Sequence, residues 1–81
     1  MFKPTEINEH YGGIQKTYAF DNGYGASVIR HKGSYGYAQG KWELAVLEGG
    51  ELCYSTSITN DVIGHLTEDE VESILKQIKE L

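Results

Sequence analysis

Two turn signals followed by one capped helical segment constrain the fold of this 81-residue chain more than any other feature. Loops of Asn-Gly or Gly-Gly join antiparallel strands, because these residues adopt the positive φ that a two-residue turn requires. The pattern therefore predicts two consecutive hairpins before the helix. The turns are Asn22-Gly23 and Gly49-Gly50, and the apolar-alternating strands that they join are residues 14–20, 25–31, 41–48 and 51–58.

The two-residue loop of the first hairpin also predicts the register of its strands. With a type I′ turn at this position, Tyr18 lies opposite Ser27. Side chains alternate between the two faces of a sheet, so Ile29 joins Tyr18 on one face in this register. Ala26 and Val28 would then lie on the opposite face.

The second hairpin leaves two registers open. A two-residue loop places Glu48 opposite Glu51, where like charges repel each other, whereas a longer loop avoids this contact. Both faces of the tight hairpin are substantially apolar. One face carries Trp42, Leu44, Val46 and Cys53, and the other carries Ala45, Leu47, Leu52, Tyr54 and Ile58.

The helix is predicted over residues 67–81. Thr67 is a favoured N-cap residue, and Glu70 three positions later completes a capping box. Apolar residues then recur at helical spacing and form one stripe that must pack on the sheet. The stripe consists of Val71, Ile74, Leu75, Ile78 and Leu81.

These elements predict an α+β fold, a four-stranded antiparallel sheet of two hairpins in a meander, with one C-terminal helix packed on one face. Residues 14–81 form a single ββββα domain, and residues 1–13 form an N-terminal arm that can supply a short edge strand. One helix covers only one face, so apolar residues on the opposite face should stay accessible. Exposed apolar patches usually mark contact surfaces.

Composition narrows the setting of the protein more than its function. The formal net charge is −5, and residues 43–72 hold eight acids without a single Lys or Arg, which suits a solvated surface or an acidic face for a basic partner. No apolar run approaches the ~18 residues of a membrane span, and the N-terminus lacks the apolar region of a secretory signal. Cys53 is the only cysteine, so no intrachain disulfide can form. We therefore expect a soluble, cytoplasmic protein without a membrane partner.

The residue types of catalysis and metal binding form no recognisable motif. His10, His31 and His65 are scattered over separate segments without metal-ligand spacing. Cys53 lies in an apolar strand, which is typical of a buried structural thiol rather than a nucleophile. Because no acid–base constellation stands out, the sequence predicts a protein that is not an enzyme and needs no cofactor or metal.

The segment 30–41 between the hairpins is rich in Gly and Tyr and contains no acid. Its tyrosines and cations can stack on bases and neutralise the phosphates of single-stranded nucleic acid, but tyrosines on Gly-rich loops equally suit protein recognition. A plain connector whose tyrosines fold back on the sheet is the third interpretation. The predicted partner-binding residues are Arg30, Lys32, Tyr35, Tyr37 and Trp42, the last of which can equally be a core residue.

Several short motifs resemble small uncharacterised proteins encoded by bacteriophages and prophages, over residues 11–81. The resemblance carries no catalytic residue, and it implies an accessory protein that acts inside a bacterial host by binding a host factor. The motifs are Tyr11-Gly-Gly-Ile-Gln-Lys, Phe20-x-Asn22-Gly-Tyr-Gly-Ala-Ser-Val28, Ser34-Tyr-Gly, Trp42-Glu-Leu-Ala-Val-Leu47, Leu52-Cys-Tyr54 and Asp61-Val-Ile-Gly64.

Three functional hypotheses follow. The first is a non-enzymatic protein-interaction module that uses the uncovered sheet face and the Tyr/Gly-rich loop. The second is a single-stranded nucleic-acid-binding accessory protein that uses the basic residues of the same loop, with binding that weakens steeply in salt. The third is a self-associating structural protein that forms a homodimer through its spare face or a free strand edge.

Overall fold

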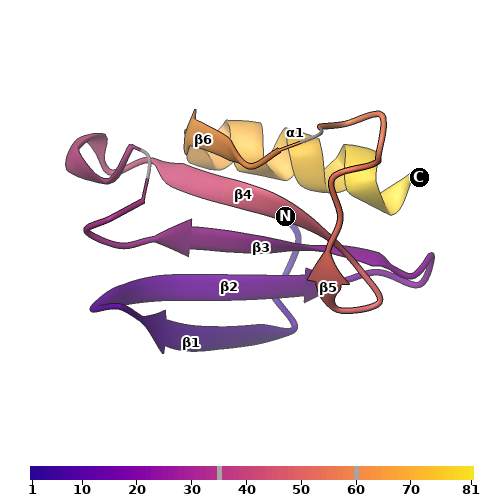
Figure 1. The fold of residues 1–81 in the computed structure, drawn as a ribbon, viewed down its shortest axis with the longest axis horizontal. Helices are drawn as coiled ribbons and strands as arrows, with labels where there is room; N and C mark the ends of the chain where they lie inside the picture. Colours follow the sequence, from indigo (N-terminus) through magenta and orange to yellow (C-terminus); the bar gives the residue numbers. More distant parts are fainter. Residues whose placement is uncertain (35, 60) are drawn as a thin grey trace.

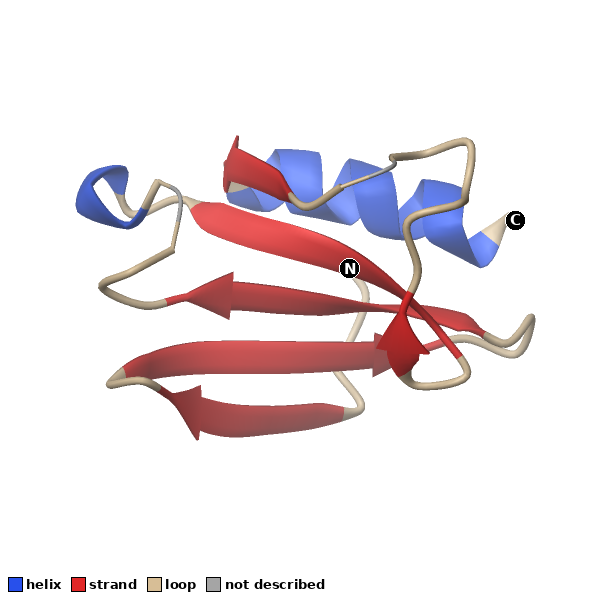
Figure 2. Cartoon of the chain, in the orientation of Figure 1, coloured by secondary structure: helices blue, strands red, loops and turns tan. Residues whose placement is uncertain are grey.

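One antiparallel sheet with a C-terminal helix on one face makes up the fold of residues 1–34, 36–59 and 61–81, which a computed structural model describes (Figure 2). Strands β1 to β5 follow one another across the sheet, and β6 pairs with β4 (Figure 1). The elements are β1 (Glu6–His10), β2 (Gly13–Ala19), β3 (Tyr24–Arg30), the 3-10 helix η1 (Tyr37–Gln39), β4 (Trp42–Glu48), β5 (Glu51–Leu52), β6 (Ile63–Leu66) and α1 (Glu68–Lys79).

The α+β class, the antiparallel sheet and the single C-terminal helix are confirmed, but the prediction of four strands is wrong. Over the described residues the sheet has six strands. β1 is the short edge strand that the N-terminal arm was expected to be able to supply, and β6 was not predicted. β1 contains a single apolar residue, Ile7, and owes its place to backbone pairing with β2. β6 includes His65 at a φ of 57° and pairs irregularly with β4, so it lacks the alternation of a regular strand.

The predicted strand 51–58 ends at Leu52, because β4 shares one edge between two partners. β5 pairs with Leu47 and Glu48, at the end of β4. β6 pairs with Trp42 and Leu44, at its beginning. The chain therefore leaves this edge after β5 and returns to it as β6. The two-residue loop is the observed one of the two open registers, with Glu48 opposite the exposed Glu51.

The predicted register of the first hairpin is wrong by one residue. Tyr18 lies opposite Ala26, not Ser27, and the loop holds three residues instead of two. Only Gly23 has a positive φ, 87°, as in a type I turn followed by a left-handed residue. A shift of one residue exchanges the faces of a strand, so Val28 points to the same side as Tyr18.

Asn22 gives a physical reason for the three-residue loop. Its side-chain nitrogen donates to the Ile78 carbonyl at 2.9 Å and to the Lys79 carbonyl at 3.1 Å. Its side-chain oxygen accepts from the Tyr24 amide at 3.0 Å. The turn is thus tied to the C-terminal end of α1, where the last carbonyls of a helix need partners.

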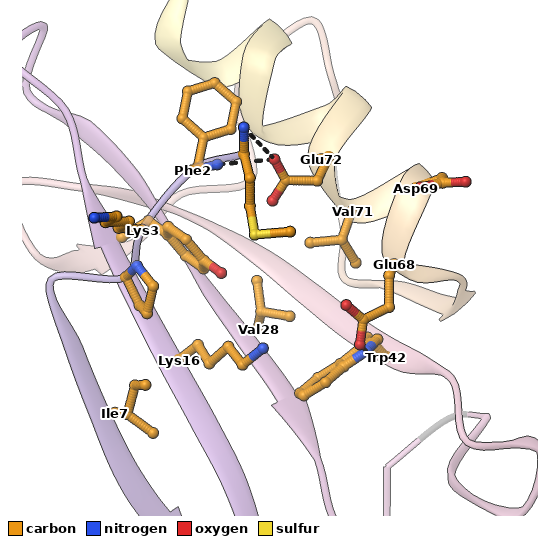
Figure 3. A pocket seen from close by; sticks show the side chains of 13 residues that line it. Phe2, Lys3, Ile7, Lys16, Val28, Trp42, Glu68, Asp69, Val71 and Glu72 are labelled. Carbon is orange, nitrogen blue, oxygen red and sulfur yellow. Dashed lines mark hydrogen bonds and ion pairs between the residues drawn. The ribbon is translucent and has the colours of Figure 1, made fainter.

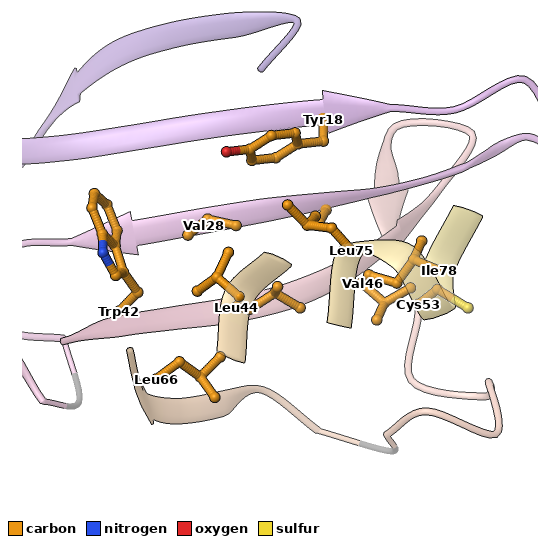
Figure 4. Packing of buried hydrophobic residues seen from close by; sticks show 11 residues of the cluster. Tyr18, Val28, Trp42, Leu44, Val46, Cys53, Leu66, Leu75 and Ile78 are labelled. Carbon is orange, nitrogen blue, oxygen red and sulfur yellow. The ribbon is translucent and has the colours of Figure 1, made fainter. Parts of the chain in front are cut away.

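The core lies between α1 and the middle of the sheet (Figure 4). It unites the helix-facing side chains of four strands with the apolar stripe of the helix, and the predicted grouping of Trp42, Leu44, Val46 and Cys53 on one face is confirmed. The core residues are Tyr18, Ala26, Val28, Trp42, Leu44, Val46, Cys53, Leu66, Val71, Leu75 and Ile78, with Ile58 packed against them rather than on the open face.

The N-terminal residues pack on the helix side of the sheet, beside α1. The Phe2 amide donates to Glu72 Oε1 at 2.8 Å, and the Phe2 and Phe20 rings meet edge to face with centroids 5.6 Å apart. The arm therefore does not cover the opposite face of the sheet.

This open face is more polar than predicted. Gln15 and Ser27 are hydrogen-bonded across it at 2.9 Å, and Ile29 and Leu47 are half-buried. Leu52 is the large apolar residue of this face that is well exposed, at 60%. Ala26 and Val28 lie in the core on the helix side, so only a narrow apolar stripe stays accessible on the open face.

The predicted capping box is confirmed and carries a pH dependence. Thr67 Oγ1 accepts from the Glu70 amide at 3.2 Å, and Glu70 Oε1 accepts from the Thr67 amide at 2.9 Å. Two hydrogen bonds with Thr67 hold the pKa of the Glu70 carboxyl below its ordinary value of 4.5, and the one with the Thr67 backbone has the larger effect. A lowered pKa means that the folded state prefers the carboxylate. This stabilisation is present above pH 4.5 and is lost as the pH falls through the folded value.

We predict that Glu70→Gln flattens the acid limb of the stability profile. The variant keeps an oxygen acceptor for the Thr67 amide but cannot titrate. Urea unfolding between about pH 3 and pH 6 should show a smaller loss of unfolding free energy for Glu70→Gln than for the wild type. Asp69→Asn removes one charge from the same helical turn and is the matched control. Equal slopes for the wild type and Glu70→Gln would contradict the capping account.

Candidate recognition surface

Two of the predicted partner-binding residues, Trp42 and Arg30, are engaged within the fold. The Trp42 side chain is 3% exposed, and the Arg30 guanidinium carbon lies 4.3 Å from the centroid of its ring. Arg30 Nη1 also donates to the Gly40 carbonyl at 3.1 Å. Together these contacts fasten the 30–41 segment to the sheet, which gives both residues a structural role.

Hydrogen bonds shape the described part of this segment. The His31 carbonyl accepts from the Ser34 amide and the Ser34 hydroxyl, both at 2.8 Å. The Gly36 carbonyl accepts from the amides of Gln39 and Lys41 at 3.0 and 2.9 Å. Gly36 has a φ of 88°, and a Cβ there would lie 2.9 Å from the His65 Cα, so this position requires glycine.

Lys32 and Tyr37 are the predicted site residues that the fold presents to solvent. Lys32 is exposed in the turn after β3. Tyr37 opens η1 and is 45% exposed. Tyr35, the remaining predicted residue, lies outside the described residues. Of the predicted residues that the structure describes, Trp42 and Arg30 are thus engaged within the fold, whereas Lys32 and Tyr37 are exposed.

Tyr11 is the surface residue that sequence reasoning missed. It forms the β1–β2 turn with Gly12, and both residues have positive φ, 48° and 78°. Its side chain is 82% exposed, and its ring contacts that of His31 at a centroid distance of 5.5 Å. This turn and the β3–β4 loop lie at the same end of the molecule (Figure 1). We call this group of Tyr11, His31, Lys32 and Tyr37 the tyrosine end.

The backbone of Tyr11 is strained, because a left-handed conformation costs a residue with a Cβ roughly 1–2 kcal/mol. Two-residue turns of this kind favour Asn or Gly at the first position. Strained residues cluster where their placement serves binding or catalysis. The available signal was the Tyr-Gly pair, which becomes recognisable as a turn only when β1 is recognised as a strand.

The cysteine and the possible metal ligands form no further site within the described residues. Cys53 is 8% exposed within the core. Nowhere in residues 1–34, 36–59 and 61–81 do three His, Cys, Asp or Glu side chains gather closely enough to hold a metal ion. In the same part of the chain, no helix has the length and apolarity needed to cross a bilayer.

Comparison with known proteins yields no relative. No protein-family model, curated protein or solved structure matches the chain. The side chains themselves are therefore the guide to what this protein binds.

We predict that Tyr11→Asn stabilises the protein, because Asn adopts the left-handed turn conformation more readily. The unfolding free energy should rise by about 0.5–1 kcal/mol, since the relieved strain exceeds the exposed ring contact that is lost. Tyr54→Asn, at another exposed tyrosine without a positive φ, should give no such gain in urea unfolding. A loss of stability in Tyr11→Asn would mean that the turn is not strained.

Proposed function

We propose that this chain is a non-enzymatic protein-interaction module whose tyrosine end contacts the partner. The observation that carries the proposal is Tyr11, a largely exposed aromatic residue held in a conformation that Asn or Gly would adopt at lower cost. The resemblance of the sequence to phage-encoded proteins makes a bacterial host protein the expected partner, and the host cytoplasm the expected site of action.

The chemistry of the tyrosine end suits a protein partner. Tyrosine provides a large amphipathic contact area while fixing few rotatable bonds, and it is enriched where binding energy concentrates. Two rings, Tyr11 and Tyr37, stand there beside the exposed ammonium of Lys32. The turns that present them are glycine-rich and hydrogen-bonded, which limits the ordering that binding must impose.

Electrostatics favours a protein over a nucleic acid. Arg30 is engaged with Trp42 and Gly40, and Lys41 is half-buried, so Lys32 is the exposed cation of the three that the loop supplies. Affinity for nucleic acid grows with the number of phosphates that are neutralised. One exposed cation in this loop, on a chain with a net charge of −5, gives little of this attraction.

The proposal is tested by capture from a bacterial lysate with two matched variants. Tyr11→Asn/Tyr37→Ala removes both rings from the tyrosine end, whereas Tyr54→Ala removes an exposed tyrosine elsewhere. A bacterial protein should be retained in stoichiometric amount by the wild type and Tyr54→Ala, and its recovery should fall at least tenfold with the double variant. Mass spectrometry identifies the retained protein, and isothermal titration with that purified protein measures its affinity.

Other outcomes would overturn the proposal. Equal recovery by all three proteins, or recovery by none, removes the tyrosine end as a binding surface. Nucleic acid in the eluate that is released by moderate salt would favour the nucleic-acid hypothesis. A second, differently tagged copy of this chain in the eluate would favour self-association through β1, the strand at the free edge of the sheet.

A further inference from the structure

A cavity of about 320 Å³ opens beside α1 on the helix side of the sheet. It lies between the N-terminal residues, the first turns of α1 and strands β1 to β4 (Figure 3). Its apolar walls include Val28, Trp42 and Val71, which belong to the core. No residue of the tyrosine end lines this cavity.

The Tyr18 hydroxyl is an unused polar group of this cavity. Its side chain is 5% exposed and lines the cavity, and its hydroxyl points along the sheet toward Trp42 (Figure 4). No residue of 1–34, 36–59 or 61–81 is hydrogen-bonded to this oxygen, yet no fully buried side-chain oxygen or nitrogen among them lacks a partner. The oxygen must therefore face the open space of the cavity, where a bound molecule can reach it.

The protonation state of this hydroxyl is well defined. Burial raises the pKa of Tyr18 above its ordinary value of 10.0, and the negative charges of Glu72 and Glu68 raise it further. The hydroxyl therefore stays protonated in neutral solution. It can donate one hydrogen bond to an acceptor in the cavity.

Lys16 and Glu68, two of the charged residues that line the cavity, have opposite charges and do not form an ion pair with each other. The Lys16 ammonium lies 4.5 Å from the centroid of the Trp42 ring, and Glu68 Oε1 lies 3.4 Å from the indole nitrogen of the same residue. Within the described parts of the chain, the one ion pair joins the Met1 amino group to Glu72, so no carboxylate comes within 4.0 Å of Lys16 Nζ. Figure 3 shows Lys16 and Glu68 approaching the Trp42 ring from the sheet and from the helix.

We propose that this cavity binds a small zwitterion with an apolar body, of which a free α-amino acid with an aliphatic side chain is the simplest. Lys16 and the Tyr18 hydroxyl bind its carboxylate, and Glu68 binds its ammonium group. The aliphatic side chain packs on Val28 and Val71. The Lys16 ammonium and the Glu68 carboxylate form no ion pair with any described residue. Together with the Tyr18 hydroxyl and the apolar floor, they complement such a ligand in both charge and polarity.

The size of the cavity excludes larger ligands, and its polar groups disfavour a purely apolar ligand. Its volume lies at the lower end of the ~300–1,000 Å³ range of small-molecule sites. A nucleotide would need more room than this volume offers. A purely apolar ligand would leave the Tyr18 hydroxyl and the Lys16 ammonium desolvated without partners, which is unfavourable.

Trp42 gives a direct readout, because it is the only tryptophan of the chain and lines the cavity. L-leucine, which does not fluoresce, should change the emission of the wild-type protein saturably, with half-saturation at about 1–10 mM. L-leucinamide lacks the carboxylate, and N-acetyl-L-leucine lacks the ammonium group. Each should bind at least about tenfold more weakly, since each loses a charge-assisted hydrogen bond.

Variants distinguish direct contact from a structural effect. Tyr18→Phe keeps the buried ring and removes only the hydroxyl, and Lys16→Met keeps the apolar stem. Both should bind L-leucine about threefold to tenfold more weakly. Both should lose less affinity for L-leucinamide, because its neutral carbonyl accepts weaker hydrogen bonds than a carboxylate. Tyr24→Phe, whose ring lies outside this cavity, is the matched control, and circular dichroism verifies the fold of each variant.

Three results would overturn the site. The first is an unchanged Trp42 emission up to about 50 mM L-leucine, which is well above the expected half-saturation. The second is equal binding of L-leucine and both of its derivatives. The third is full affinity for L-leucine in Tyr18→Phe. The comparison of the three ligands uses the wild-type protein alone, so it decides the question even if a variant does not fold. None of these results depends on the tyrosine end or its partner.

Discussion

The three-residue turn between β2 and β3 is the constraint on which the rest of the structure depends. Asn22 bonds to the last carbonyls of α1, and Gly23 takes the left-handed conformation that closes the loop. This arrangement sets Tyr18 opposite Ala26. Because one residue of register decides which side chains face the helix, the same turn determines the composition of the core and of the open face.

The two candidate sites follow from this register in different ways. The Tyr18 side chain faces α1 and is buried, and its hydroxyl faces the cavity. On the other side of the sheet, polar residues such as Gln15 and Ser27 occupy the surface, so that face offers no broad apolar patch. The tyrosine end owes its place to the hairpin turns, and none of its residues lines the cavity.

Local signals in the sequence predicted what local interactions determine. The capping box at Thr67 and the Gly-rich second turn each involve residues close in the sequence, and both are confirmed. The first turn was predicted wrongly, because Asn22 bonds to a carbonyl 56 residues further along the chain. The N-terminal arm was expected only to be able to supply a short edge strand, which is β1, and β6 was not predicted. Both strands depend on pairing with the backbone of other strands rather than on apolar alternation.

The candidate surface was predictable only in part for the same reason. Composition singled out the 30–41 segment, where Lys32 and Tyr37 are exposed, but it could not show that Arg30 stacks on Trp42.

Nuclear magnetic resonance tests the register of β2 and β3 most directly, because α-protons approach closely across non-hydrogen-bonded antiparallel pairs. With Phe20 and Tyr24 hydrogen-bonded beside the loop, a nuclear Overhauser effect should join the α-protons of Ser27 and Thr17. The same effect between Ser27 and Tyr18 would contradict the account.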